Sequence, residues 1–248
     1  MLLAIKMGNS TLCIAKFNNP LEENFSIIYE TVTEKLSLRS LNKVFFKHKG
    51  MDCIICSVVP AFTQKFIEKY NSIFRKILII NSKLNTGLKL KVKNKEKFGS
   101  DRLACCVAAY EIWKENLAII DAGTATTITV VTNKGEVLGG SIMPGLRMMR
   151  YALHEKTAVL PSIEFDGPVS ALGVDTESAI RSGIILGTVY ALKGIIKEIE
   201  KSTNFKLKTI LTGGNAFLLS KYLNFSTHLE PYLVVKGMRL IYLKNIEN

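Results

Sequence analysis

The stretch IIDAGTATTITV occupies residues 119–130, and AIKMGNSTLCIA at residues 4–15 repeats its pattern. Each copy consists of an apolar strand, a glycine turn with small hydroxyl or amide side chains, and a second strand with β-branched residues, which is typical of a hairpin. In this alignment Lys6 corresponds to Asp121 and Gly8 corresponds to Gly123. Because the pattern recurs near the start of each half of the chain, it predicts two structurally related domains, residues 1–115 and 116–248.

Strand-like and helix-like segments alternate after each hairpin. This alternation predicts an α/β fold in which mixed sheets are flanked by helices. Ser100 or Asp101 can cap the second predicted helix, and Asp175 or Thr176 can cap the third. The predicted strands are Ile27–Val32, Cys53–Val59, Lys76–Ile80, Glu136–Gly139 and Thr209–Thr212, and the predicted helices are Pro60–Tyr70, Leu103–Glu115 and Thr176–Lys201.

The composition is that of a folded globular protein, because 48% of the 248 residues are hydrophobic. The most apolar stretch, Gly183–Ile196, is interrupted by Thr188 and Lys193 and is too short to span a membrane. The apolar run at the N-terminus ends at Lys6, without the features of a signal peptide. We therefore expect a cytoplasmic protein with no membrane partner.

The cysteines point to a reducing compartment, because there are five of them at low density. Cys53 and Cys56 have the spacing of a redox or metal pair, but they lie within a segment that has the pattern of a buried strand. Cys105 and Cys106 lie in an apolar helical segment. We expect all four to be core residues.

The formal net charge of +12 has two interpretations. A basic surface can bind nucleic acid through its phosphates, or lysine can simply replace other surface residues. The densest basic segment, Lys89–Lys97, contains five lysines and one glutamate, with no interleaved aromatic residue. No nucleic-acid-binding motif accompanies it, so nucleic acid is not an expected partner.

Three glycine-containing turns follow predicted strands, at Gly8–Thr11, Gly123–Thr127 and Gly213-Gly214. Glycine lets a ligand approach the backbone closely, and successive N–H groups can form an anion-binding nest. Standard phosphate motifs are absent, since the chain has no Gly-Lys pair and no G-x-G-x-x-G. The turns are either ordinary hairpin turns or a set of loops that holds a nucleotide, and their number favours the second interpretation.

Two aspartates are candidates for chemistry. Asp121 ends an apolar strand, where a carboxylate is costly to bury unless it binds a cation or a hydrogen-bond donor. Asp101 lies beside Arg102 at a predicted helix start and could accept a hydroxyl proton, as an aspartate does in kinases. The alternative for Asp101 is a helix N-cap. The histidines His48, His154 and His228 are scattered and are expected to have packing or surface roles.

Several motifs together resemble type III pantothenate kinases, in the actin/hexokinase-like ATPase superfamily, some of which have been described as Bvg accessory factors. The resemblance covers nearly the whole chain. The matching motifs are Gly8-Asn9-Ser10, Ser57-Val58-Val59-Pro60, Gly99-Ser100-Asp101-Arg102, Asp121–Thr127, Gly139–Gly145, Thr157–Pro161, Thr176 with the helix after it, and Thr212-Gly213-Gly214.

The resemblance implies two RNase H-like halves with a cleft between them, and ATP-dependent phosphorylation of pantothenate to 4'-phosphopantothenate, the first step toward coenzyme A. It also implies a homodimer, Mg²⁺ bound with ATP, and a monovalent cation, K⁺ or NH₄⁺. By the same resemblance, Asp101 is the general base; Gly99, Ser100, Asp101, Arg102 and Thr176 bind pantothenate; Gly8, Asn9, Ser10, Thr124, Gly213 and Gly214 bind ATP; and Asp121 binds the monovalent cation.

The sequence departs from the family pattern at Lys6, where the first phosphate motif of the family begins with aspartate. Lysine would repel the metal, but it could contact a phosphate directly, as kinase lysines do elsewhere. Val92 stands where a tyrosine is common near pantothenate. Three alternatives therefore remain: an active kinase with altered metal handling, an impaired member that acts as a regulatory or transcription accessory protein, and a kinase for another small hydroxyl compound.

Overall fold

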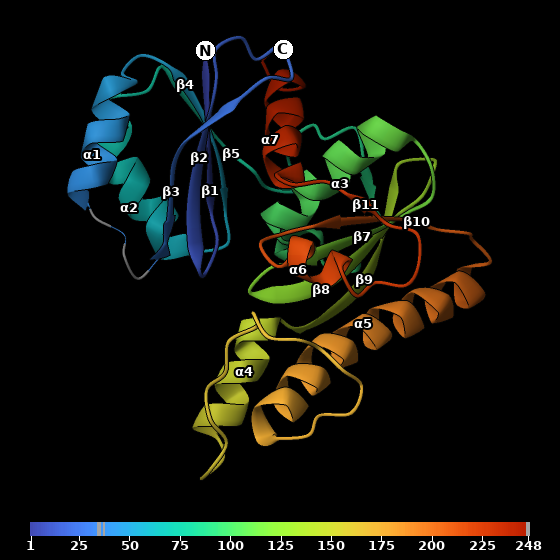
Figure 1. Ribbon diagram of the computed structural model, residues 1–248. Coiled ribbons are helices and arrows are strands. Elements are labelled where there is room, and N and C mark those ends of the chain that lie inside the picture. Colours follow the sequence, from blue (N-terminus) through green and yellow to red (C-terminus); the bar gives the residue numbers. More distant parts are fainter. Residues whose placement is uncertain (34–35, 37, 247–248) are drawn as a thin grey trace. The chain divides into compact units, whose positions relative to one another are not determined.

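The computed structural model describes residues 1–33, 36 and 38–246 and divides into two compact units (Figure 1). Unit 1 contains Met1–Trp113, Gly135–Val137 and the segment that begins at Tyr232, whereas unit 2 contains Lys114–Lys134 and Leu138–Pro231. This division differs from two consecutive halves, because the C-terminal segment packs with the N-terminal one. Sequence repeats reveal related hairpins but not where the chain returns to an earlier unit.

The sheet of unit 1 has the strand order β3-β2-β1-β4-β5. Its first three strands are antiparallel neighbours, and β1, β4 and β5 run parallel. Nearly every residue of β1 and β4 is buried, as expected for central strands covered on both faces. The strands are β1 (Leu2–Met7), β2 (Thr11–Phe17), β3 (Ser26–Val32), β4 (Asp52–Ser57) and β5 (Lys76–Ile79).

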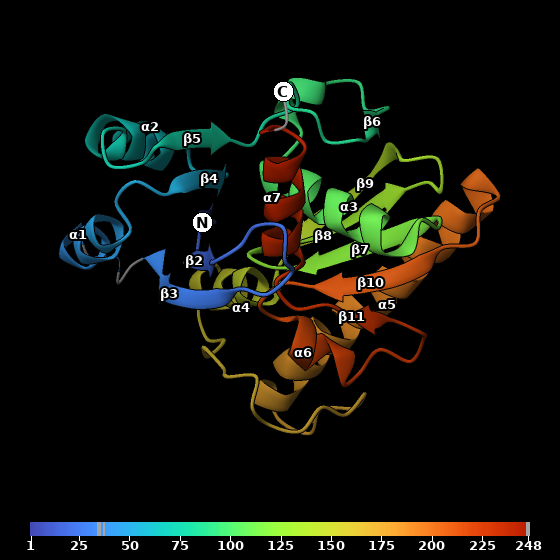
Figure 2. The same ribbon diagram turned by 90° about the horizontal axis from the view of Figure 1, so that it is seen from above.

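Helices cover both faces of this sheet. Phe45 of α1 and Phe66 of α2 pack with Ile5 and Ile55 in one hydrophobic core. On the other face, α7 contacts β1 and β4 and lies beside α3 (Figure 2). The helices are α1 (Leu38–Lys47), α2 (Pro60–Tyr70), α3 (Ser100–Trp113) and α7 (Leu233–Leu243), with a 3₁₀ turn, η2 (Lys95–Lys97), before α3.

The second sheet has the strand order β11-β10-β7-β8-β9-β6. In the reverse direction, its strands β9-β8-β7-β10-β11 correspond one by one to β3-β2-β1-β4-β5 of unit 1. The repeated hairpin therefore begins the same sheet topology twice. The α/β class with two mixed sheets and flanking helices is confirmed. The strands are β6 (Lys89–Leu90), β7 (Leu117–Ala122), β8 (Ala125–Val131), β9 (Glu136–Pro144), β10 (Lys208–Thr212) and β11 (His228–Leu229), and the remaining helices are α4 (Leu146–Glu155), α5 (Thr176–Thr203) and α6 (Ala216–Ser220).

The two hairpins differ by one residue in their turns. Met7 pairs with Leu12 across the first turn, and Ala122 pairs with Thr126 across the second. The first turn thus holds the additional residue, and the sequence alignment of residues 4–15 with residues 119–130 is correct only as far as the glycine. Side-chain patterns cannot reveal this difference, because both second strands have the same β-branched character.

Helix α5 is long and apolar enough to cross a membrane by length and composition alone. It is instead a core helix of unit 2, in which Ile180, Ile184 and Leu192 pack with the strands. Its start is as predicted, because the side chain of Asp175 accepts a hydrogen bond from the Ser178 N–H at 2.8 Å.

A buried carboxylate joins the last helix to β4 in unit 1. Asp52 is 3% exposed and receives two hydrogen bonds of 2.7 Å from Arg75 and one from the hydroxyl of Tyr242 in α7. The Arg75 hydrogen bond, assisted by Tyr242, lowers the pKa of Asp52 below its usual range. Burial and the neighbouring Asp52 raise the pKa of Tyr242 to about 12, so its hydroxyl stays a donor.

We expect Asp52→Asn to lower the free energy of unfolding by about 1–2 kcal/mol at neutral pH, discounted because Arg75 is largely exposed. Because the pKa of Asp52 is lower in the folded protein than its value of 3.8 in the unfolded chain, ionised Asp52 stabilises the fold at pH values above 3.8. This stabilisation is lost as the pH falls through the pKa of Asp52 in the folded protein. Urea unfolding of both proteins should therefore give a difference at pH 7 that shrinks at about pH 3. A difference independent of pH would contradict this account, and Asp166→Asn, at an exposed site, is the matched control.

Candidate functional site

The first glycine turn is closed by backbone hydrogen bonds within unit 1. Gly8 donates to the Thr11 carbonyl at 2.9 Å, and Thr33 at the end of β3 donates to the Ser10 carbonyl at 2.9 Å. The side chains of Asn9 and Ser10 are exposed at its tip. Hydrogen bonds thus hold the turn, which presents the polar side chains of Asn9 and Ser10 to solvent.

Lys6 lies on the strand that leads into this turn. The strand registers place Glu30, Cys13, Lys6 and Cys56 in one row across four strands, on the same face of the sheet. Burial, with Glu30, raises the pKa of Cys13 to about 11 against the opposing effect of Lys6. Cys13 is therefore a neutral thiol between a cation and an anion, and the Lys6 charge lies close to the glycine turn.

Asp101 lies in the first turn of α3, which begins at Ser100. The prediction that Ser100 or Asp101 precedes the helix as its cap is wrong, because Leu103 already donates a helical hydrogen bond to the Gly99 carbonyl. The Oδ1 atom of Asp101 accepts a hydrogen bond of 2.7 Å from the Arg102 N–H. Among the described residues, Oδ2 has no hydrogen-bond donor, so one carboxylate oxygen is fixed and the other is available.

Gly99 leaves the space that this carboxylate occupies. A Cβ atom at Gly99 would lie 2.7 Å from Asp101 Oδ1, a contact that side chains do not make. A larger residue at this position would therefore force the Asp101 carboxylate to turn away from its present orientation.

The remaining two residues of the motif hold the start of α3 in place. Ser100 donates a hydrogen bond of 3.0 Å to the Ser57 carbonyl at the end of β4 and accepts one of 3.6 Å from the Cys56 thiol. The guanidinium of Arg102 lies 4.5 Å from the centroid of the Phe98 ring, and burial lowers the pKa of Arg102. Gly99, Ser100, Asp101 and Arg102 thus form one local structure in unit 1, as the motif predicts.

In unit 2, the second and third glycine turns lie together. Asn215, after Gly213-Gly214, donates from its backbone to the Ala122 carbonyl at 2.9 Å and from its side chain to the Gly123 carbonyl at 3.3 Å. Gly145 donates to the Thr124 carbonyl at 3.0 Å. Two segments that are remote in sequence therefore support the turn that begins at Gly123. Asn215 and Gly145 had no assigned role in the sequence interpretation, although Gly145 lies within a quoted motif.

The carboxylate of Asp121 lies against this junction. A Cβ atom at Gly213, where φ is +96°, would lie 2.4 Å from Asp121 Oδ1. The pairing registers place Thr212 and Thr127 on either side of Asp121, on the same face of the sheet. The buried Thr127 hydroxyl has no hydrogen-bond partner among the described residues. A carboxylate beside an unsatisfied hydroxyl fits a hard cation, which prefers oxygen ligands.

The other predicted positions are less connected. Thr176 is the first residue of α5 and is exposed, and no hydrogen bond links it to the glycine turns of its unit. His48 is half-buried and His154 is exposed, and a ring nitrogen of each lies within hydrogen-bond distance of a backbone carbonyl, as fits the packing or surface roles expected of them. Cys53, Cys56, Cys105 and Cys106 are buried free thiols, as predicted. Within the described residues, no group of three or more His, Cys, Asp or Glu could hold a metal ion.

Solved structures share this fold over nearly their whole length. A protein from Campylobacter jejuni assigned to the Baf family of transcriptional activators is 19% identical, with a TM-score of 0.67 over 99% of this chain and 100% of that chain. A protein from Sinorhizobium meliloti assigned as a 2-dehydro-3-deoxygalactonokinase is 11% identical, with a TM-score of 0.59 over 100% and 98%. The Lmo2764 protein from Listeria monocytogenes, assigned as an N-acetylmannosamine kinase, is 12% identical, with a TM-score of 0.53 over 100% and 99%. At these identities, the likeness shows the fold.

The family is shown by the sequence itself. Residues 2–198 match the family described as type III pantothenate kinase, and this range includes both hairpins, the Asp101 motif and most of α5. The chain therefore belongs to the type III pantothenate kinase family.

Proposed function

We propose that this protein transfers the γ-phosphoryl group of ATP to the primary hydroxyl of pantothenate, in the cytoplasm, as the first step of coenzyme A biosynthesis. The observation that carries the proposal is the arrangement at the start of α3. Asp101 has one oxygen fixed by the Arg102 N–H and the other without a donor among the described residues. Such a carboxylate is oriented to accept the hydroxyl proton of a bound alcohol.

The other residues of the motif would bind the acceptor substrate. Arg102 is a partly buried cation, which suits the carboxylate of pantothenate, because charge-assisted hydrogen bonds strengthen away from water. Ser100 and Gly99 fix the position of the base, and Thr176 would contribute a further contact to pantothenate. Val92 stands where a tyrosine is common near pantothenate, so pantothenate would lose one aromatic contact.

The glycine turns would bind the nucleotide. In unit 1 the half-buried Gly8 and the exposed Asn9 and Ser10 would hold the phosphates, as would Thr124 in unit 2. Gly213 and Gly214 would lie near the nucleoside. Lys6 would add a positive charge for the phosphates, which attracts them directly. Each polar loop is held by backbone hydrogen bonds within its own unit, so each would need little reordering on binding.

The described part of the chain offers candidate ligands for the monovalent cation but not for Mg²⁺. Asp121 and Thr127 would hold K⁺ or NH₄⁺, which supplies positive charge beside the phosphates. The Lys6 side chain cannot ligate Mg²⁺, so no protein ligand is assigned to the magnesium that accompanies ATP. The protein groups that act would then be Asp101 as the base and Arg102 as the anchor for pantothenate. Lys6 and the turn N–H groups would donate hydrogen bonds to the phosphates.

We expect Asp101→Asn to lower kcat for phosphopantothenate formation by about 10²–10⁴-fold, because it removes the proton acceptor. Gly99→Ala should lower kcat by about 10²-fold, because the new methyl group displaces the carboxylate without removing it. Mass spectrometry of product formed from ATP, Mg²⁺, K⁺ and pantothenate measures both. Asp166→Asn is the matched control, and full activity in Asp101→Asn would exclude Asp101 as the base.

Lys6 is tested by changing its charge. If Lys6 binds phosphate, Lys6→Gln should raise the KM for ATP by about tenfold, which corresponds to the loss of one charge-assisted hydrogen bond, and Lys6→Asp should raise it further. Lys16→Gln, at a position on the opposite face of the same sheet, should leave KM unchanged. A higher kcat/KM in Lys6→Asp than in the native chain would instead show that lysine impairs the enzyme.

We also propose that the protein is a homodimer formed through α5. One face of this helix carries Gly183, Gly187 and Gly194, where an added Cβ atom would meet open space, and Tyr190, which is 60% exposed. Small residues on one face let a second helix approach closely, and the exposed tyrosine gives apolar contact area. The same helix carries a shallow apolar groove lined by Ala191, Ile195 and Ile199.

Light scattering after gel filtration should therefore give twice the chain mass of 27.6 kDa. Gly187→Arg should give the chain mass, because a long charged side chain prevents close helix packing. Lys206→Glu, in the loop after α5, changes the charge of an exposed site outside the helix and should leave the dimer intact. A monomeric native chain would exclude the proposal.

A further inference from the structure

A pocket of about 560 Å³ lies in unit 1. Its walls are the loop Ser82–Leu88, strand β6, Lys91, Lys95 and one residue of α3, Leu103. Its volume is in the range of small-molecule sites. None of the residues expected to hold ATP, pantothenate or a cation lines it.

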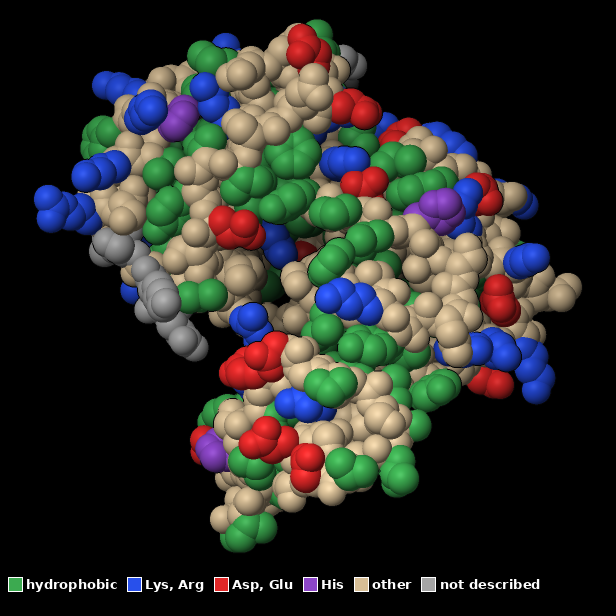
Figure 3. Space-filling model, in the orientation of Figure 1, with side chains coloured by type: hydrophobic (Ala, Val, Ile, Leu, Met, Phe, Trp, Pro, Cys, Tyr) green, Lys and Arg blue, Asp and Glu red, His purple; other side chains and the backbone are tan. Residues whose placement is uncertain are grey.

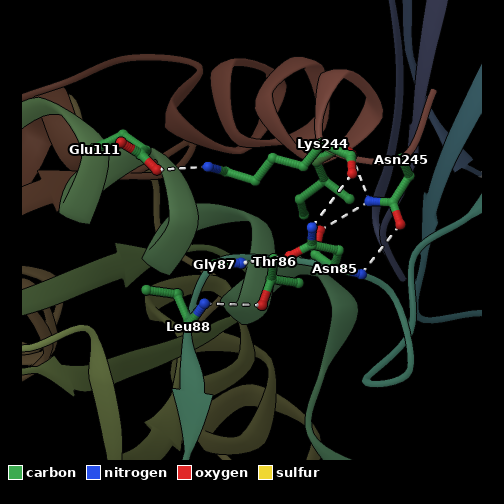
Figure 4. Close-up of polar contacts among 8 residues, drawn as sticks. Asn85, Thr86, Gly87, Leu88, Glu111, Lys244 and Asn245 are labelled. Carbon is green, nitrogen blue, oxygen red and sulfur yellow. Dashed lines mark hydrogen bonds and ion pairs between the residues drawn. The ribbon is translucent and has the colours of Figure 1, made fainter. Parts of the chain in front are cut away.

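The loop wall of this pocket is fixed by the C-terminal end of α7. The backbone N–H of Asn85 donates to Asn245 Oδ1 at 3.1 Å, and Asn245 Nδ2 donates back to the Asn85 carbonyl at 2.8 Å (Figure 4). Lys244 is held beside Gly87 by an ion pair of 2.8 Å with Glu111. The pocket therefore has a defined wall, although its loop has no regular secondary structure.

The basic segment Lys89–Lys97 forms the charged side of the pocket. Only Lys89, Lys91 and Lys95 line it, whereas Lys93 and Lys97 do not. Lys91 forms an ion pair of 3.2 Å with Glu136. Among the described residues, Lys89 and Lys95 have no carboxylate partner, and no aspartate or glutamate lines the pocket. Two uncompensated ammonium groups thus face one concave site.

The opposite side of the pocket is apolar. Leu84, Leu88 and Leu90 are half-buried there, and Leu103 is 1% exposed. Most backbone N–H groups of the loop already donate to the Asn81, Asn85 and Thr86 side chains or to Asn245, so the lysines are the available donors. Lysine binds phosphate as a point charge and needs no planar geometry. Lys and Arg side chains are scattered over the face drawn in Figure 3, so charge alone does not mark a site on this protein. The pocket is distinguished by its concave lining as well as by its lysines.

We propose that this pocket is a second binding site, for a small phosphorylated molecule whose phosphate lies between Lys89 and Lys95 and whose apolar part contacts the leucines. The site is connected to the proposed base by a short path along the chain. Lys95 is the first residue of η2, and Phe98 and Gly99 come directly after the end of η2. A ligand held by Lys95 would thus restrain the segment that positions Asp101.

Lysine footprinting with inorganic pyrophosphate as the probe tests the site. The full chain is acetylated with and without the probe, and labelling of each lysine is measured by mass spectrometry. With the probe at about ten times its Kd, about nine-tenths of the sites are filled, so labelling of Lys89 and Lys95 should fall by about tenfold. Labelling of Lys93 and Lys97, which lie on the same segment outside the pocket, should be unchanged.

Paired variants provide the second arm. Lys89→Gln with Lys95→Gln should remove one pyrophosphate-binding event in calorimetry, and Lys93→Gln with Lys97→Gln should retain it. Binding at the glycine turns is read separately, through protection of Lys6, so failure of the proposed kinase site and failure of this pocket are distinguishable. Equal protection of all four lysines, or equal loss of binding in both double variants, would show diffuse surface attraction and would overturn the proposal.

Discussion

Two carboxylates lie against two glycines, and the candidate site depends on the space that these glycines leave. Asp101 approaches Gly99 within one helix start, and Asp121 approaches Gly213 across two strands. Any larger residue would compete with the carboxylate for the same volume. The glycine and its carboxylate are therefore spatially coupled in each case, even though they are 2 residues apart in the first and 92 in the second.

The related hairpins differ in charge at corresponding places. Asp121 and Lys6 each lie one residue before the end of the first strand, and each has a neighbour in a polar row across its sheet. In unit 2 the row places hydroxyl groups beside a carboxylate, whereas in unit 1 it places a thiol and a carboxylate beside an ammonium group. The same hairpin geometry thus carries a positive side chain, Lys6, in one unit and a negative side chain, Asp121, in the other. The backbone fixes where the charge lies, and the side chain fixes its sign.

The sequence predicted those helix starts that depend on residues close together in the chain. Asp175 and Ser178 form a capping box, and α5 starts where the sequence indicates; Pro60 likewise begins α2. Helices α4 and α7 have no side-chain cap, and α7 begins after Tyr232 in a left-handed conformation, so neither gives a start signal. In the site, the motif containing Asp101 is visible in the sequence, but the support of Gly123 by Asn215 is not, because a hydrogen bond between residues so far apart depends on the completed sheet.

The return of α7 to unit 1 has a consequence for synthesis. Asp52 emerges from the ribosome 190 residues before its partner Tyr242. Arg239, which donates to the Pro20 carbonyl, follows that residue by 219 positions. The segments of unit 2 end at Pro231, before α7 is made. The usual order in which N-terminal domains finish first is thus reversed, and the face of β1 and β4 that α7 covers stays uncovered until α7 has been synthesised.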